Sequence, residues 1–402
     1  MNILLNLIPV TFGGGLQVAA NFIDTVIDHN GYGHNWWIMV AKGDELSNIL
    51  RRRNYKNTIE VDNSPLKRMW FEKFKINDII QNNKIDIMYS YGPGIPQDTI
   101  PTVVRSAYSN LYYPEIDFWG NWPLKKRIIA KVKDKYRLAT TLKADALIFE
   151  NKGMRSRAIK NFGYNSNNTF FIKPSVSQFN SGEIDKKKIP EKFKGIPADN
   201  FNIVMLTAWH KNKNIDLVPY ILKELKDEGV TDVNYLISVE ADHPYSHTLM
   251  AKAKEFGVET NIYLLGRVKV DEVKYLYAVS SASMLLSKLE CFSSNIIEAW
   301  TYQKPLLLAD EEWARSICED AVIYVDRDDA QQIADKIRQL KTVKGTYKTI
   351  VDNGLTQIKT YNTPEQKVIK QIKFLEFVYR NFARHGKKWY LDQSISNNLS
   401  DN

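Results

Sequence analysis

The densest group of chemically capable side chains lies in residues 287–308, SKLECFSSNIIEAWTYQKPLLL. A strand is expected to end near Ser287, and a helix is expected to begin at Ser294. The first turn of a helix presents free backbone N–H groups with partial positive charge, so this turn is a candidate anion site. The amides concerned are those of Phe292, Ser293, Ser294 and Asn295.

Two carboxylates flank this candidate anion site. Glu290 precedes the helix and would lie beside the group that carries the anion. Glu298, about one turn into the helix, is placed to reach a hydroxylated group, and an anion joined to a polyol describes a nucleotide sugar. A structural alternative stays open, in which Glu298 takes part in helix capping and Glu290 is a solvated loop residue.

A second basic candidate is the segment TAWHKNKNIDL, residues 207–217, where a strand is expected to end and a helix to begin at Asn214. Lys213, with Lys211 close by, is placed to hold its ammonium group over a diphosphate at the carboxyl edge of the sheet. A solvated basic turn is the structural alternative.

The glycine run Gly13–Gly15 lies in the first expected strand-to-helix turn. Glycine lets the backbone approach a phosphate or a sugar closely, and a helix N-terminus follows. The run is not GxGxxG, and no acidic residue ends an obvious second strand about 20 residues later, so a nicotinamide dinucleotide site is disfavoured.

The positive charge of the chain is concentrated in its first half. Residues 1–180 hold 24 Lys and Arg against 15 Asp and Glu, which accounts for the whole net charge of +9, because residues 181–402 hold 31 of each. The densest part, Lys125–Lys143, has an amphipathic helical pattern that is typical of helices lying on an anionic membrane surface. A solvated helix face is the structural alternative, and nucleic acid is disfavoured because no nucleic-acid-binding module is found.

Composition excludes several other classes of protein. The 402 residues are 44% hydrophobic and 25% charged, as in ordinary globular proteins of two domains. Cys291 and Cys318 are the only cysteines, which excludes a disulfide framework. His243 and His247 lie four residues apart without a third ligand, so no metal site is predicted. No signal peptide or membrane-spanning segment is expected, which indicates a cytoplasmic protein.

Strands that alternate with helices are expected to position these residues. In the first half the expected strands are 3–10, 35–40, 85–89, 101–104 and 146–149. In the second half they are 201–207, 233–240, 262–265, 283–287, 305–309 and 321–325. This alternation predicts an α/β protein with doubly wound parallel sheets, in which ligands lie at the carboxyl ends of the strands.

The expected domain organisation has five parts. They are an N-terminal domain at 1–173, a linker at 174–200, a second domain at 201–363, a helix at 364–390 and a flexible tail at 391–402. The linker is expected from its prolines, glycines and lysine run.

Together these motifs resemble the retaining glycosyltransferases of GT-B fold, in particular the family 4 group that builds bacterial surface polysaccharides and glycolipids. The residues that carry the resemblance are Gly14–Gln17, Lys213–Asn214, Leu265–Val268, the E-x7-E motif Glu290–Glu298, and Lys304–Pro305. The resemblance implies two Rossmann-like domains facing across a cleft, with the C-terminal helix crossing back to the first domain.

The resemblance also implies a role for each candidate residue. Glu290 would contact the transferred sugar, the amides of residues 292–295 would bind sugar hydroxyls and phosphate, and Glu298 would bind the ribose. Lys213 would neutralise the diphosphate, helped by Lys211, and the loop Gly266–Val268 would line the base pocket. In the first domain, Gly14 and Gly15 would face the donor, and Gln17 and Arg105 the acceptor. Such enzymes need no metal and no cofactor.

Three positions depart from the family pattern. Ser293 replaces the glycine of the usual E-G-F-G, the Gly-Arg that usually precedes Lys213 is absent, and Arg105 stands where a histidine often lies near the donor sugar. These departures bear on the identity of the donor more than on the class of reaction.

The hypothesis from the sequence is a retaining glycosyltransferase on the inner face of the cytoplasmic membrane. It would move a sugar from a nucleotide donor to a hydroxyl of a glycan or lipid-linked acceptor, for a surface polysaccharide such as lipopolysaccharide or capsule. Two alternatives stay open: a GT-B nucleotide-sugar epimerase or phosphorylase, and a non-catalytic glycan-binding subunit.

Overall fold

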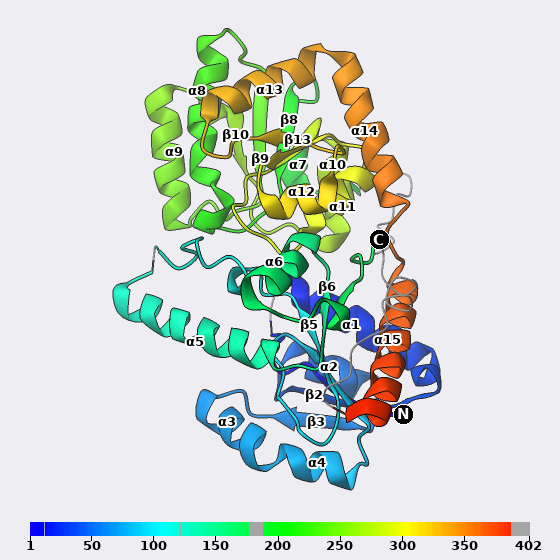
Figure 1. The fold of residues 1–402 in the computed structure, drawn as a ribbon. Coiled ribbons are helices and arrows are strands. Elements are labelled where there is room, and N and C mark those ends of the chain that lie inside the picture. Colours follow the sequence, from blue (N-terminus) through cyan, green and yellow to red (C-terminus); the bar gives the residue numbers. More distant parts are fainter. Residues whose placement is uncertain (12, 121, 177–187, 387–402) are drawn as a thin grey trace. The chain divides into compact units, whose positions relative to one another are not determined.

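The chain forms two compact units in a computed structural model, which describes residues 1–11, 13–120, 122–176 and 188–386 (Figure 1). Of the described residues, those in 1–175 and those from 362 on form unit 1, and those in 176–361 form unit 2. The expected linker, 174–200, lies partly outside the described residues, and its described end contains the short helix α7 (Glu191–Lys194). Residues 387–390 of the expected terminal helix and the expected tail, 391–402, also lie outside them.

Unit 1 is built on a parallel sheet with the strand order β3-β2-β1-β4-β5-β6-β7. The strands are β1 (Asn2–Asn6), β2 (Asn35–Ala41), β3 (Thr58–Val61), β4 (Ile87–Tyr91), β5 (Thr102–Ser106), β6 (Ala146–Phe149) and β7 (Thr169–Phe171). The helices are α1 (Gly13–Asp28), α2 (Glu45–Arg52), α3 (Pro65–Phe74), α4 (Ile76–Asn82), α5 (Leu124–Leu142), α6 (Lys152–Phe162) and α15 (Pro364–His385).

The five strands expected in the first half are present, with ends that shift by a few residues. The edge strands β3 and β7 were not expected. They are short, and β3 is only partly buried, so neither shows the continuous apolar run of a central parallel strand.

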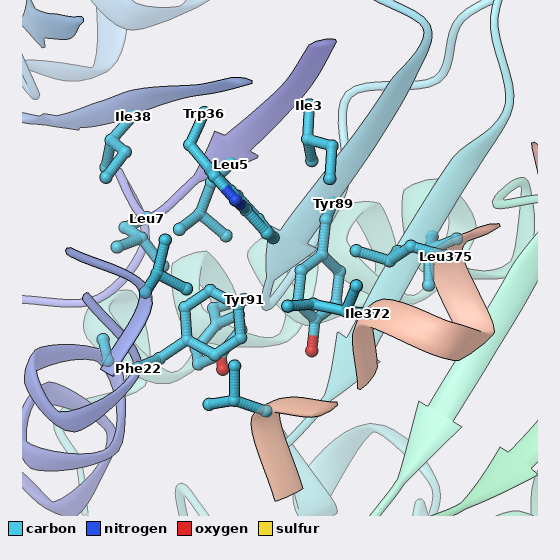
Figure 2. Packing of buried hydrophobic residues seen from close by; sticks show 14 of the residues in the cluster. Ile3, Leu5, Leu7, Phe22, Trp36, Ile38, Tyr89, Tyr91, Ile372 and Leu375 are labelled. Atoms are coloured by element: carbon cyan, nitrogen blue, oxygen red, sulfur yellow. The ribbon is translucent and has the colours of Figure 1, made fainter. Parts of the chain in front are cut away.

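The core of unit 1 explains why the last helix returns to the first domain. Phe22 of α1 packs edge-on against Trp36 of β2, with ring centroids 5.5 Å apart, and Ile372 and Leu375 of α15 lie in the same cluster (Figure 2). The apolar stripe of α15 therefore covers the same face of the sheet as α1. The expected crossing of the terminal helix to the first domain is confirmed for its described part.

Unit 2 carries a parallel sheet with the strand order β10-β9-β8-β11-β12-β13. The strands are β8 (Phe201–Met205), β9 (Val233–Ile237), β10 (Ile262–Leu264), β11 (Ala282–Leu285), β12 (Leu306–Ala309) and β13 (Ile323–Val325). The helices after α7 are α8 (Val218–Asp227), α9 (Pro244–Phe256), α10 (Val273–Ala278), α11 (Ser294–Thr301), α12 (Glu312–Cys318), α13 (Ala330–Thr342) and α14 (Lys344–Ile358).

All six strands expected in the second half are present, but β8 and β9 end two and three residues earlier than expected. In both sheets the first strand of the unit lies between the second and the fourth, which is the doubly wound order. The topological switch point of unit 2 therefore lies between β8 and β11, and the loops that follow these two strands meet there.

Candidate functional site

The switch point of unit 2 brings Lys213 and Glu290 together. β8 and β11 are neighbours in the sheet, and Lys213 follows β8 while Glu290 follows β11. The ammonium group of Lys213 donates a hydrogen bond to the Glu290 carboxylate across 77 residues of sequence. The two side chains keep 22% and 19% of their surface exposed, so a ligand can still reach the pair.

Asn212 ties the two loops to each other. Its side-chain amide donates to the carbonyl of Leu289 at 2.8 Å, and its side-chain oxygen accepts from the N–H of Leu289 at 3.0 Å. Its backbone carbonyl accepts from the N–H of Lys288 at 2.9 Å. Sequence reasoning missed this role of Asn212, because the partner loop is recognisable only once β8 and β11 are neighbours.

The basic turn after β8 has a defined shape. Lys211–Lys213 form a 3-10 turn, which ends at Asn214 in the left-handed region with φ of 51°. The Asn214 side chain donates to the carbonyl of Arg327 at 2.6 Å, just after β13. Burial lowers the pKa of His210, and the neighbouring Lys213 ammonium lowers it further. Because the turn is hydrogen-bonded to the loops after β11 and β13, it is not the solvated basic turn of the structural alternative. Lys211 itself is exposed.

The first turn of α11 lies beside this pair. Ser293 is the N-cap residue, and within the described chain its side chain makes no capping hydrogen bond. The Asn295 side chain instead donates to the carbonyl of Leu206, at the end of β8, at 2.7 Å. Phe292 is partly buried and Ser294 is exposed. The helix is thereby fixed to β8, and a ligand can satisfy the first-turn amides.

Glu298 lies deeper than the other candidate residues. Its side chain is 6% exposed, and its Oε2 atom has no hydrogen-bond partner among the described residues. Burial raises the pKa of its carboxyl to about 7, and the nearby Tyr277 hydroxyl offsets only part of this rise. The structural alternative of a capping carboxylate is not seen, because Glu298 is the fifth residue of α11, beyond the N3 position of a capping box, and Ser293 makes no side-chain capping bond to any residue that the structure describes.

Replacing Glu298 by Gln is expected to stabilise the protein above pH 7. The wild-type carboxyl must ionise in the interior as the pH rises from its unfolded value of 4.5 through about 7, so the wild type loses stability over this window. The loss is at most about 3 kcal/mol. Thermal unfolding at pH 5 and pH 8 measures it: the variant should gain melting temperature at pH 8 only, and equal gains at both values would contradict the assignment.

A pocket of about 580 Å³ opens at the carboxyl ends of β8, β9 and β10. Trp209, Glu240, His243 and Val268 are among the residues that line it. The Trp209 and His243 rings are stacked, with centroids 5.9 Å apart. Such a pocket can hold a flat aromatic base against apolar walls.

The loop after β10 that forms one wall of this pocket is held by Glu240. The Glu240 side chain accepts from the N–H of Arg267 at 3.1 Å. Gly266 has a φ of +63°, and a Cβ atom there would lie 2.9 Å from the Glu240 carboxylate, so this loop needs glycine. Val268, Trp209 and Glu240 thus line this pocket, and the expected role of Val268 toward a nucleotide base stays a prediction.

The candidate residues of the first domain lie in unit 1. Gly14, Gly15 and Gln17 belong to the exposed first turn of α1. A Cβ atom on Gly14 would meet nothing within 4 Å, and one on Gly15 only the Val10 side chain at 3.7 Å. The Gln17 amide donates to the Asn21 side chain at 2.8 Å. These residues are accessible, and their roles toward donor and acceptor stay predictions.

Arg105 lies in the interior of unit 1. Its guanidinium is buried and donates two hydrogen bonds to the Glu150 carboxylate, at 2.9 and 2.5 Å. Lys367 of α15 forms a second ion pair with the same carboxylate. Arg105 therefore helps to hold α15 on the sheet, and its geometry offers no support for the expected contact with an acceptor.

Solved structures with similar architecture identify the fold of the chain. A glycosyltransferase from Rickettsia africae ESF-5 is 16% identical, with a TM-score of 0.71 over 94% of this chain and 99% of that one. Anabaena Alr3699/HepE in complex with UDP and glucose is 14% identical, with a TM-score of 0.68 over the same shares. WaaG, a glycosyltransferase involved in lipopolysaccharide biosynthesis, is 14% identical, with a TM-score of 0.67 over 93% and 99%. The chain therefore has the GT-B fold, with two Rossmann-like domains.

A sequence model of a protein family matches part of the chain. Residues 186–357 match the family described as Glycosyl transferases group 1, and this stretch contains Lys213, Glu290 and Glu298. A sequence comparison with curated proteins finds no match. Fold and family model together support a glycosyltransferase of GT-B fold.

Two features are absent from residues 1–11, 13–120, 122–176 and 188–386, the part that the structure describes. In this part of the chain, no group of three or more His, Cys, Asp and Glu side chains is arranged to hold a metal ion. No helix within it is long and apolar enough to cross a membrane.

Proposed function

We propose that this protein is a retaining, metal-independent glycosyltransferase that moves a sugar from a nucleotide-sugar donor to a hydroxyl of a glycan or lipid-linked acceptor, in the synthesis of a cell-surface polysaccharide. The observation that carries the proposal is the Lys213–Glu290 pair, at the switch point of unit 2 and beside the N-terminus of α11. HepE, of the same fold, has been solved with UDP-glucose, which supports a donor of this kind.

The chemistry follows from the charges at this point of the sheet. Departure of a nucleoside diphosphate leaves negative charge on the phosphate and positive charge on the sugar. Lys213 and the first-turn amides of α11 would stabilise the phosphate, which makes a divalent cation unnecessary. The Glu290 carboxylate would face the positive sugar, and attack from the side of the departing phosphate would retain the configuration. The pocket beside Trp209 would take the base, and Glu298 the ribose hydroxyls.

Lys213 provides a direct test of donor binding. Replacing it by Ala should weaken binding of a nucleoside diphosphate by about 10- to 100-fold, because it removes a charge-assisted contact and leaves the Glu290 carboxylate unpaired. Titration calorimetry with UDP and GDP measures the effect. Lys223→Ala, at an exposed ion pair on α8, is the matched control and should bind as the wild type does. Equal affinity of the Lys213→Ala variant would remove Lys213 from the site.

A panel of nucleotide sugars tests the reaction itself. At least one donor should raise the melting temperature and be consumed when an acceptor is present, with the anomeric configuration retained in the product. Product formed without an acceptor would indicate an epimerase, and a requirement for inorganic phosphate would indicate a phosphorylase. No thermal shift and no donor consumption would indicate a glycan-binding subunit.

To reach its acceptor, the protein is proposed to lie peripherally on the inner face of the cytoplasmic membrane. Helix α5 supports it, since it contains most of the basic segment Lys125–Lys143. Leu124, Ile128, Val132 and Tyr136 recur every fourth residue along α5 and are between 55% and 72% exposed. The residues of α5 that face the interior are Ala130, Thr140 and Thr141. An exposed apolar stripe set among lysines is typical of helices that lie in a membrane surface.

A further inference from the structure

Helix α3 of unit 1 has an apolar face that the described residues leave exposed. None of its ten residues is buried, and all ten are described. Leu66, Met69, Trp70 and Phe74 are between 53% and 76% exposed. A helix this short is marginal without tertiary packing, so four large apolar side chains turned to solvent mark it as an interaction element.

The exposed side chains of α3 form one stripe. Leu66, Trp70 and Phe74 recur every fourth residue, and Met69 lies between them on the same face. Phe71, about 100° around the helix from Trp70, packs against the buried cluster that contains Ile76 of α4. The stripe therefore points away from the sheet, as the stripe of α5 does.

Helices α3 and α5 lie over the same face of the unit 1 sheet. α15 covers the other face, where its Phe374 stacks on Phe170 of β7 at 4.0 Å. α4, which continues α3, packs through Ile76 and Ile80 on the face opposite α15. α5 connects the neighbouring parallel strands β5 and β6, and a right-handed crossover places it on that face too. In Figure 1 both helices lie on the side of unit 1 away from α15.

The charges around the two stripes select the occupant. Lys67, Lys73 and Lys75 flank the stripe of α3, where Lys67 pairs with Asp62 at 2.7 Å and Lys75 with Asp78 at 3.7 Å. The Lys73 and Lys75 ammonium groups lie 5.2 and 5.8 Å from the ring centroids of Phe74 and Trp70. Lysines whose stems run along apolar groups keep their charge at the level of lipid head groups. A second copy of the chain would bring the same positive charge, whereas an anionic bilayer has the opposite charge.

We propose that α3 and α5 form one bipartite membrane-docking surface, in which Leu66, Trp70 and Phe74 insert into an anionic bilayer beside the stripe of α5. The inference rests on the proposed peripheral position and adds a second, mainly apolar, contact to it. Two separated helices would fix the orientation of unit 1 on the membrane, which a single helix cannot do, because the unit could roll about that helix.

Vesicle binding by the full chain tests the surface. Wild-type protein should sediment with vesicles of phosphatidylglycerol and phosphatidylcholine, more strongly at low than at high salt. Leu66→Ser, Trp70→Ser and Phe74→Ser combined should weaken binding by about 10- to 100-fold, because the three side chains leave the bilayer. Because these side chains touch little of the protein, unchanged melting temperature and unchanged donor binding are expected. The matched control is Val270→Ser, an exposed apolar residue of unit 2.

The outcomes separate the two proposals. If wild type fails to bind anionic vesicles, the peripheral position itself is wrong. If wild type binds and the triple variant binds equally well, α5 alone docks and the role of α3 is overturned. If the wild type forms dimers in sedimentation velocity that the triple variant does not, α3 is instead a contact between copies of the chain, which also overturns the inference.

Discussion

Replacing Glu290 by Gln is expected to lower the turnover number by about 10²- to 10³-fold, with little change in nucleotide affinity. The substitution keeps the shape of the side chain and removes the charge that would face the positive sugar in the transition state. It also frees Lys213 from its ion pair, so nucleoside diphosphate binding should stay the same or tighten. Steady-state kinetics with the donor found in the panel, together with calorimetry, separate the two effects.

The control for Glu290 is Glu255→Gln, which removes an exposed carboxylate in the last turn of α9. This variant should keep wild-type turnover. A Glu290→Gln enzyme with full activity would overturn the proposed role. A large loss of nucleotide affinity with unchanged turnover would show instead that Glu290 binds the donor only in its ground state.

Replacing Glu150 by Gln is expected to destabilise unit 1 by about 3 to 5 kcal/mol. Burial would raise the pKa of this carboxyl, but the charges of Arg105 and Lys367 and their hydrogen bonds lower it to about 2. The substitution leaves two buried cations without their shared carboxylate. Because Lys367 lies on α15, the loss should appear as release of this helix from the sheet, measured by urea unfolding and by amide exchange in α15.

The pH dependence of the same cluster gives a second readout. The folded pKa of Glu150 lies below its unfolded value of 4.5, so its contribution is present above about pH 4.5 and is lost as the pH falls toward 2. The Glu150→Gln variant should lack this acid-sensitive contribution to the stability of unit 1. Glu115→Gln, which breaks an exposed pair with Arg157, is the control and should cost less than about 1 kcal/mol. Equal stability of the two variants would contradict the buried-cluster account.

Much of unit 2 was predictable from the sequence. Each of its central strands is a short apolar run next to an amphipathic helix, and this periodicity is a local property of the chain. The positions of Lys213, Glu290 and the start of α11 followed from the ends of those runs. The ends of β8 and β9 were predicted two to three residues too late, because apolar residues such as Leu206 and Val239 continue past the last strand pairing into the loops that line the pocket.

The interior of unit 1 shows what local patterns miss. Arg105 looks like an accessible cation at the end of a strand, yet it is buried against Glu150, 45 residues further along the chain. The same carboxylate also pairs with Lys367, 262 residues from Arg105. The stripe of α3 was also missed. Its apolar spacing fits a core helix as well as it fits a helix with an exposed apolar face. Only the burial of each residue distinguishes these two kinds of helix.

The sequence by itself determined the alternation of strands and helices, the segregation of positive charge into the first half and the residue types available at each loop, because these are properties of neighbouring residues. Only the tertiary structure decided which of those residues meet. The pairing of β8 with β11 places Lys213 against Glu290, and the return of α15 brings Lys367 to the carboxylate that Arg105 also contacts. The physical reason is that the order of strands in a sheet arises from burial and pairing between segments far apart in the chain, and no local pattern records it.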